Sequence, residues 1–353
     1  MALGSRITKT FIGARALAGL AGALALGMAA VPAQAQSTNF EAMFDSALGT
    51  ETRAPRTFEA VYQTGFEQRI AIAADGSKGR IGVSVLDLAT GQEFSILGDQ
   101  RFPMASTSKI AIAATFLEGV EQGRWSLSSE FPLLFPLRSQ PFSSPKAPVR
   151  RGKHLPASEL IELMITRSSN PATDALLAVV GGPEAVNDWM RRAGIEDFQL
   201  TRDIATLVRD DGEIDPAAAI DLRDSATPRA MTKLLAGLYQ GRWLSPSSRA
   251  VIIGAMERCR TGKRRIPALL PAGATVAHKT GSLNNTSSDI GIINTPDGRA
   301  FAVAIYVTGQ GSRLARESRI AQIARAAYAG YDNPGGGTWA EAVYSRDGAA
   351  ASP

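Results

Sequence analysis

The stretch Phe102-Pro-Met-Ala-Ser-Thr-Ser-Lys109 places a serine three residues before a lysine, directly after two strand-like runs and at the start of a helical pattern. Ser106 and Lys109 then lie one turn apart on the same face of a helix. A serine hydroxyl attacks a carbonyl only when another group takes its proton and amide donors hold the oxyanion. A serine at a helix N-terminus has a free backbone amide for the second task. This stretch therefore predicts a nucleophilic serine.

Two polar clusters further along the chain supply partners for this serine. They are Ser168-Ser169-Asn170, at the end of a helical pattern, and Lys279-Thr280-Gly281-Ser282, on a strand pattern. Lys109 acts as a base only if the pKa of its ammonium is lowered, which burial and a second cation, Lys279, would do. Each cluster alone is weak evidence, because a Ser-x-x-Lys pair normally lies on a solvated helix face. Their order and spacing together predict an acyl-transfer site.

Strand patterns lie at both ends of the chain. Two precede the serine motif and three lie near the C-terminus, at residues 80–88, 93–97, 276–280, 288–293 and 300–307. Short turn sequences rich in glycine, proline and aspartate separate neighbouring strands. Five strands in two distant groups predict one antiparallel sheet.

The segment between the two strand groups has helical periodicity instead. Helices are predicted at residues 110–122, at 159–165 with Ser158 as the N-cap, from Pro171, Pro183 and Pro228, and at 313–329. The predicted fold is therefore α/β of the α+β type: a five-stranded antiparallel sheet flanked by terminal helices, with an inserted all-helical lobe. We expect one domain at 57–331, with a sheet lobe at 57–105 and 272–331 and a helical lobe at 106–271.

The first 35 residues have the pattern of a secretory signal peptide. Three cations and no acid precede an apolar run, and a small-x-small sequence ends at Ala35. The apolar run is shorter than the roughly 20 residues that a membrane-spanning helix needs. We therefore expect cleavage near Ala35 and a periplasmic protein without a stable membrane anchor. Residues 36–56 are expected to form an N-terminal extension, and 332–353 a disordered tail.

Composition narrows the function classes. Removing the three signal cations from the net charge of +5 leaves +2, so the chain's basicity does not indicate nucleic-acid binding. The one cysteine, Cys259, lies in an apolar helical pattern, which favours a buried small hydrophobe over a nucleophilic thiol. His154 and His278 supply too few ligands to indicate a metal site, and no cofactor is indicated. Without a coiled-coil pattern, a monomer is expected.

The three motifs in this order resemble the penicillin-recognising serine enzymes, specifically the class A β-lactamases and their close penicillin-binding relatives. The resemblance extends to Thr261-Gly262, to Arg265-Ile266 and to Asp224-Ser-Ala-Thr-Pro-Arg229, and it covers roughly residues 57–331. It implies a β-lactam or a peptidoglycan peptide as the substrate.

The resemblance also implies a role for each motif residue. Ser106 would be the nucleophile, Lys109 its base, and Ser168 the relay that gives a proton to the leaving nitrogen. Asn170 would help to hold the substrate amide. The third motif would bind the substrate carboxylate, allow close backbone approach and donate an oxyanion-hole amide together with that of Ser106. These positions are Lys279, Thr280, Gly281 and Ser282.

Two features depart from the family pattern. Ser169 replaces the usual aspartate of the second motif, a carboxylate that braces the loop. More seriously, the family's Arg-x-Glu-Pro-x-x-x-Asn run, whose glutamate activates the deacylating water, is missing between Thr201 and Asp224. The stretch Leu137–Pro145 is also unusual, and we interpret it as an insertion at the groove rim. Nor does the sequence identify the arginine that assists Lys279 with a carboxylate.

The segment that lacks the glutamate run contains several acids. The candidates for the deacylation base are Asp210, Asp211 and Glu213, and a solvent-exposed acidic loop is the alternative interpretation. Arg202 and Asp224 are expected to form the ion pair that closes the neck of this loop.

Three function classes follow. The first is a periplasmic class A β-lactamase-like serine hydrolase that forms an acyl-enzyme on Ser106. The second is a DD-peptidase or penicillin-binding acyl-transferase acting on peptidoglycan stem peptides, because the loss of one general base slows deacylation by about 10²–10⁴-fold. The third is a non-catalytic cell-wall ligand-binding module.

Overall fold

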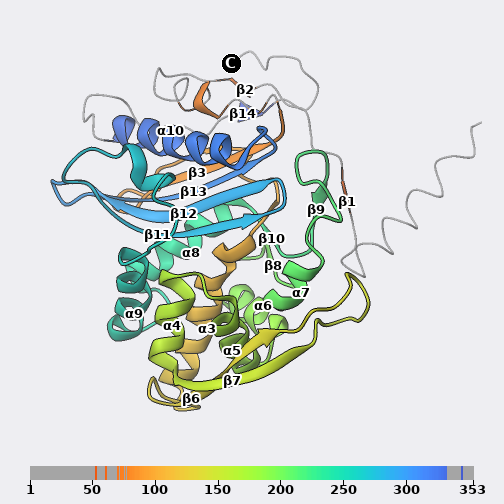
Figure 1. The fold of residues 1–353 in the computed structure, drawn as a ribbon. Coiled ribbons are helices and arrows are strands. Elements are labelled where there is room, and N and C mark those ends of the chain that lie inside the picture. Colours follow the sequence, from red (N-terminus) through yellow and green to blue (C-terminus); the bar gives the residue numbers. More distant parts are fainter. Residues whose placement is uncertain are drawn as a thin grey trace, which may run out of the picture. The chain divides into compact units, whose positions relative to one another are not determined.

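The structure is a computed structural model, shown as a ribbon in Figure 1. It describes residues 78–331 without a break, together with 52–53, 60–61, 70, 72–74, 76 and 343–344. The expected signal peptide lies outside the described residues, as do nearly all of the expected extension and tail. Among the helices in the described part of the chain, none has the length and apolar character needed to cross a membrane.

A five-stranded antiparallel sheet forms the centre of the fold, with the strand order β11-β12-β13-β3-β4. Its strands are β3 (Ile81–Asp87), β4 (Glu93–Ile96), β11 (Thr275–Leu283), β12 (Thr286–Asn294) and β13 (Ala300–Thr308). The middle pairing joins β13 to β3, with Val303 opposite Val85. The two groups of strands predicted from the sequence therefore meet inside one sheet, which confirms the predicted fold class.

Helices cover the sheet and fill the region next to it. Figure 1 shows α10 (Arg313–Tyr331) on one face of the sheet and α8 (Pro228–Gln240) on the other. The other helical segments are η1 (Ala105–Ser108), α3 (Lys109–Glu121), α4 (Ala157–Thr166), α5 (Asn170–Val180), α6 (Pro183–Arg192), α7 (Ile204–Arg209), α9 (Pro246–Glu257) and η2 (Ile266–Leu269). Pro183 and Pro228 are the first residues of their helices, as predicted, whereas Pro171 is the second residue of α5, which begins at Asn170.

The start of α4 differs from the prediction. Ser158 is not its N-cap, because the helix begins at Ala157 and is preceded by Pro156. The amide of Ala157 donates to the carbonyl of Ser129, and the amide of Ser158 donates to that of Leu127. These backbone partners satisfy amides that a side-chain cap would otherwise serve, so no capping serine is needed.

A hairpin that the sequence did not indicate runs along the helical region. It consists of β6 (Glu130–Pro136) and β7 (Val149–Pro156), and the stretch interpreted as a rim insertion connects its strands. The remaining strands have two residues each: β1 (Thr52–Arg53), β2 (Ala60–Val61), β5 (Phe102–Pro103), β8 (Phe198–Gln199), β9 (Ile220–Asp221), β10 (Ser225–Ala226) and β14 (Val343–Tyr344).

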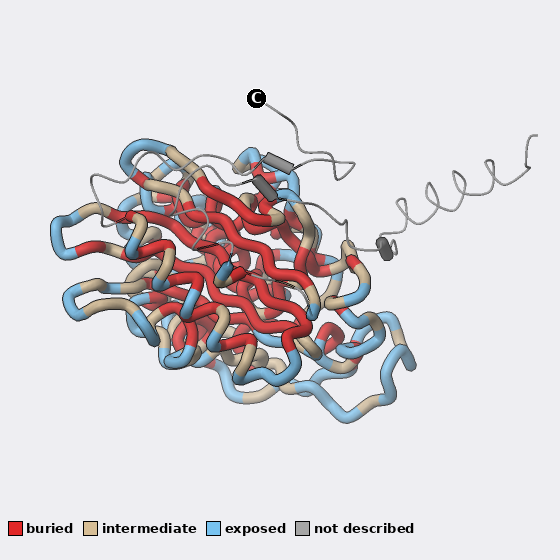
Figure 2. Tube along the Cα trace, turned by 90° about the horizontal axis from the view of Figure 1, so that it is seen from above, coloured by how far each residue is buried: buried red, intermediate tan, exposed pale blue. Residues whose placement is uncertain are grey.

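Alternation of side chains divides the core into two layers. On β13, Phe301 and Val303 pack in the layer that contains the buried residues of α10. Ala302 and Tyr306 point the opposite way, into the layer shared with α8 and the other helices. Figure 2 shows the sheet strands as continuous buried segments with exposed connections at their ends. Because both faces of the sheet are covered, its central strand β13 is apolar from Ala300 to Val307.

We expect Phe301→Ala to lower the free energy of unfolding by about 3–5 kcal/mol, because it empties a fully buried ring site between the sheet and α10. Urea unfolding followed by circular dichroism measures this change. The control is Leu314→Ala on α10, whose side chain is 59% exposed and should change stability by about 0.5 kcal/mol or less. Equal losses in the two variants would contradict the described core.

Candidate active site

A rigid turn carries Ser106 between β5 and α3. Ala105 has a positive φ of 48°, a strained conformation for a residue with a side chain. Ser108 Oγ donates to the carbonyl of Ala105 at 2.9 Å, and Thr107 Oγ1 donates to that of Met104 at 2.8 Å. Both of these side chains are buried, whereas Ser106 is partly exposed. The turn therefore leaves Ser106 accessible, while the buried side chains of Thr107 and Ser108 hold the backbone around it in place.

Lys109 begins α3 and is fully buried. Its Nζ donates to the carbonyl oxygen of Ser168 at 2.8 Å, to Ser168 Oγ at 3.2 Å and to Asn170 Oδ1 at 2.8 Å. These acceptors match the three hydrogens of an ammonium group. None of the three bonds goes to Ser106, the group that we expected Lys109 to reach.

Lys279 on β11 is also fully buried. Its Nζ donates to Ser168 Oγ at 2.9 Å and to the carbonyl oxygen of Thr280 at 2.8 Å. Ser168 Oγ therefore accepts hydrogen bonds from both lysines. A hydroxyl oxygen has two acceptor lone pairs, so when both amines donate, the proton of Ser168 is free for a third group.

Burial controls the charge of both lysines. It lowers the pKa of Lys109 well below the ordinary value, and the positive charge of Lys279 lowers it further, while Asp174 acts in the opposite direction. Burial also lowers the pKa of Lys279, to about 8. A neutral amine at Lys109 has the lone pair that a base requires.

The second motif forms the start of α5. Ser169 is the N-cap of this helix, and its Oγ accepts from the amide of Ala172 at 3.4 Å. The carbonyl oxygen of Ser169 accepts from Thr173 Oγ1 at 2.7 Å. The serine that replaces the family's aspartate thus caps the helix that carries Asn170.

The third motif brings β11 against η1. β11 is an edge strand of the sheet, and a β-carbon added at Gly281 would lie 2.7 Å from the carbonyl oxygen of Met104 and 3.1 Å from Ala105 Cβ. A glycine is therefore required for this close approach. Ser106 and Ser282 directly follow the residues in contact, so their backbone segments lie next to each other.

Arg265 is a cation beside this motif that sequence reasoning missed. Its side chain is 1% exposed, its Nη2 donates to Ser282 Oγ at 2.7 Å, and its Nη1 donates to the carbonyl oxygen of Gly281 at 2.8 Å. Glu317 on α10 accepts from Nη2 at 3.1 Å and holds the guanidinium in place. The available signal was its position just after Thr261-Gly262, within the stretch that resembles the family.

The segment at 201–224 is closed at its neck by an ion pair between a partly buried arginine and a buried aspartate. Arg202 Nε lies 2.6 Å from Asp224 Oδ2, the pairing expected from the sequence. Asp224 Oδ1 also accepts from the amides of Thr201 at 2.7 Å and Arg202 at 3.1 Å. The carboxylate thus fixes both the side chain and the backbone at the start of the segment.

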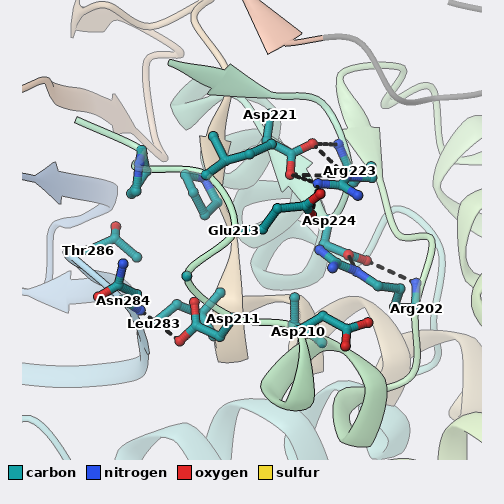
Figure 3. Close-up of a pocket in the computed structure, with 15 residues that line it drawn as sticks. Arg202, Asp210, Asp211, Glu213, Asp221, Arg223, Asp224, Leu283, Asn284 and Thr286 are labelled. Carbon is teal, nitrogen blue, oxygen red and sulfur yellow. Dashed lines mark hydrogen bonds and ion pairs between the residues drawn. The ribbon is translucent and has the colours of Figure 1, made fainter. Parts of the chain in front are cut away.

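The three candidate acids line a pocket between this segment and the turn from β11 to β12 (Figure 3). Asp211 accepts from the backbone amide of Asn284 at 2.8 Å, which ties the segment to the turn after β11. Burial raises the pKa of Asp211. Neither Ser106 nor Lys109 lines this pocket, so the structure does not bring the three acids together with the nucleophile.

The other two acids are paired with arginines. Asp210 Oδ1 lies 2.7 Å from Arg209 Nε and also accepts from the amide of Phe142 at 3.0 Å. Glu213 Oε2 lies 2.7 Å from Arg223 Nη2. These ion pairs occupy the oxygens that a general base would need.

An aliphatic residue begins α7, the helix of this segment. The amides of Ile204 and Ala205 donate to the two carboxylate oxygens of Asp174 at 2.7 and 2.9 Å, while Asp203 caps the helix. Burial raises the pKa of Asp174 to about 7. Asp174, which the sequence did not single out, therefore attaches α7 to α5.

Within the described part of the chain, no group of three or more His, Cys, Asp or Glu side chains is arranged to hold a metal ion.

Comparison with known proteins adds to this geometry. A model of the beta-lactamase enzyme family matches residues 65–331. The extended-spectrum beta-lactamase PER-1 of Pseudomonas aeruginosa is 29% identical over 74% of this chain and 86% of its own. The imipenem-hydrolyzing beta-lactamase of Enterobacter cloacae is 31% identical over 72% of this chain and 85% of its own. The solved structure of an ancestral class A beta-lactamase is 34% identical, with a TM-score of 0.65 over 75% of this chain and 99% of its own.

We expect Asp224→Ala to lower the free energy of unfolding by about 3–5 kcal/mol, because it leaves Arg202 and two backbone amides without their buried acceptor. Urea unfolding of the purified variant measures the loss. Asp197→Ala serves as the matched control, since Asp197 is 61% exposed and its ion pair with Arg101 should be worth about 0–1 kcal/mol. A loss at Asp224 no larger than that of the control would contradict a structural role for the pair.

Proposed function

The chain belongs to the beta-lactamase enzyme family, and we propose that it is a serine hydrolase that opens β-lactam amides through an acyl-enzyme on Ser106. The observation that carries the proposal is the arrangement of two buried lysines around one hydroxyl, Ser168 Oγ, beside a partly exposed serine. This arrangement supplies a base and a proton relay without a histidine.

Acylation proceeds in three proton transfers. Neutral Lys109 takes the proton of Ser106 as its Oγ attacks the β-lactam carbonyl, and the amides of Ser106 and Ser282 stabilise the oxyanion. Ser168 then donates its proton to the leaving nitrogen and recovers one from an adjacent lysine. Lys109 Nζ lies 3.2 Å from Ser168 Oγ, so the proton returns along an existing hydrogen bond.

The same strand selects an anionic substrate. Lys279 and Thr280 bind the carboxylate of the β-lactam, and Arg265 adds a second buried cation two residues along β11 from Thr280, at Ser282. Asn170 donates its side-chain amide to the acylamino group of the substrate, since its Oδ1 already accepts from Lys109.

Deacylation needs a base from the segment at 201–224. Among the three candidates, Asp211 is the one that accepts hydrogen bonds from backbone amides and forms no ion pair with an arginine among the described residues. Asp210 and Glu213 are both held by arginines. We therefore assign deacylation first to Asp211, with Asp210 and Glu213 as the alternatives. Because the pocket that these acids line does not include Ser106, the assignment requires the segment to approach the acyl group once substrate is bound.

The relatives named above are all β-lactamases, which favours hydrolysis over a peptidase or a non-catalytic binding module. The remaining parts of the proposal rest on the sequence. They are secretion to the periplasm after cleavage near Ala35, the absence of a stable membrane anchor, and a monomeric state.

We expect the purified mature protein mixed with benzylpenicillin to show a covalent adduct that decays as the drug is consumed. Intact-mass spectrometry from seconds to hours, with drug absorbance followed in parallel, measures both events. Ser106→Ala should abolish the adduct, whereas the control Ser169→Asp should retain it. An Asp211→Asn variant should accumulate the adduct, because loss of a general base slows deacylation by about 10²–10⁴-fold.

Adduct formation in Ser106→Ala would overturn the nucleophile assignment. A stable adduct in the unmodified enzyme, with little drug consumed, would instead indicate a penicillin-binding acyl-transferase. If Asp210→Asn or Glu213→Gln accumulates the adduct and Asp211→Asn does not, the base belongs to that residue.

The affinity for an anionic substrate should fall as the pH rises through about 8. The pKa of Lys279 is lowered to about 8, so its ammonium is present below this pH and lost above it. The KM for benzylpenicillin, measured from pH 6 to 9.5, should therefore rise above pH 8. In Lys279→Arg the cation persists throughout this range, so the same rise should be absent. A flat wild-type profile would contradict the role of Lys279.

A further inference from the structure

A cysteine, a histidine and an aspartate that the proposed hydrolysis does not use form a second group of reactive side chains next to the active site. His278 on β11 and Asp289 on β12 are both buried, and His278 Nδ1 lies 2.9 and 3.0 Å from the two carboxylate oxygens of Asp289. Asp289 Oδ2 also accepts from the amide of Ile266. The imidazole is thus fixed in orientation by a rigid carboxylate.

Cys259 completes this group. The side chain of His278 interacts with the Cys259 thiol, and His278 Nδ1 faces Asp289. The expectation of a buried small hydrophobe is wrong, since Cys259 is partly exposed. The reason is that α9 ends at Glu257, so Cys259 does not continue its apolar face.

The charges around the sulfur favour a thiolate. Burial alone would raise the pKa of the Cys259 thiol, but the hydrogen bond and the charge of His278 outweigh it and lower the pKa. Burial would lower the pKa of His278, but Asp289 and the thiol raise it to about 10. Lys279 on β11 is a further cation that interacts electrostatically with the Cys259 sulfur. Such a partly exposed thiol in a cationic setting is typical of reactive cysteines.

We propose that Cys259 is a modification site that takes small disulfides by thiol–disulfide exchange, with His278 and Asp289 as its proton donor and orienting carboxylate. The Cys259 sulfur attacks one sulfur of the small disulfide, so that a new S–S bond forms and the old one breaks. The leaving thiolate takes the proton carried by His278. The product is a mixed disulfide and one small thiol.

This site is connected to the substrate-binding strand. Cys259 Sγ lies 3.4 Å from Thr261 Oγ1, which lies 2.7 Å from Thr280 Oγ1. A group attached to the sulfur displaces Thr261 and with it the partner of the Thr280 hydroxyl. Modification of Cys259 therefore weakens binding of the substrate carboxylate, a consequence that rests on the proposed function.

Reaction with 4,4′-dithiodipyridine tests the site, because the released thione is followed by absorbance and the chain has a single cysteine. We expect the wild-type rate to fall less steeply than that of an ordinary thiol as the pH is lowered from 8 to 5. In His278→Gln the rate at pH 6 should be lower by about tenfold or more, since an ordinary thiol with a pKa of about 8.5 is almost fully protonated there. Asp289→Asn, which keeps the shape of the cluster, should also slow the reaction, and Cys259→Ala should not react. A wild-type pH profile equal to that of an ordinary thiol, or no effect of His278→Gln, would overturn the proposal.

The link to substrate binding has its own measurement. The KM for benzylpenicillin should rise severalfold after modification by cystamine, return on treatment with dithiothreitol, and stay unchanged in cystamine-treated Cys259→Ala. Exchange without any change in KM would overturn the link through Thr261. Because thiol exchange is measured without a β-lactam, failure of the proposed hydrolysis and failure of the thiol site give different results.

Discussion

Two buried amino groups meet at one hydroxyl oxygen, and the rest of the site depends on this constraint. Lys109 and Lys279 both donate to Ser168 Oγ, and none of the ion pairs among the described residues includes either lysine. Like charges brought out of water destabilise each other's charged form, so the pair loses a proton easily. The fold must hold the amines together, and it does so by anchoring one in a helix and the other in a strand of a fully covered sheet.

The parts of the fold that sequence patterns predicted are those with strong local signals. β13 reads as an uninterrupted apolar run because its residues are buried on both faces of the sheet. The three motifs singled out Ser106, Ser168 and the two lysines for a similar reason: each motif is short and contiguous. The structure brings both lysines together at Ser168. Even the Arg202–Asp224 pair follows from residues at the two ends of one segment.

What the sequence did not reveal depends on contacts between distant segments. The hairpin of β6 and β7 has prolines and cations where strand patterns require apolar alternation, and its form depends on packing against α5. The surroundings of Arg265 and Cys259 could not be predicted, because Ser282, which Arg265 contacts, and His278, which lowers the pKa of Cys259, lie on the distant strand β11. The acids of the loop were equivalent in the sequence, and only the arginines that pair with Asp210 and Glu213 distinguish them from Asp211.

The pairing of β13 with β3 also fixes the order in which parts of this protein can fold. The amide of Arg80 and Thr308 Oγ1 form a hydrogen bond across 228 residues of sequence, so the sheet cannot close until nearly the whole domain has been synthesised. Long-range pairing of this kind has a high contact order and forms slowly, whereas the helices between the two strand groups make nearer contacts. Ser106 follows the N-terminal group of strands and Lys279 lies in the C-terminal group, so the two residues come together only when the two groups pair. The chemistry of the site is therefore assembled only when folding is almost complete, and a partly folded chain carries a serine without its second cation.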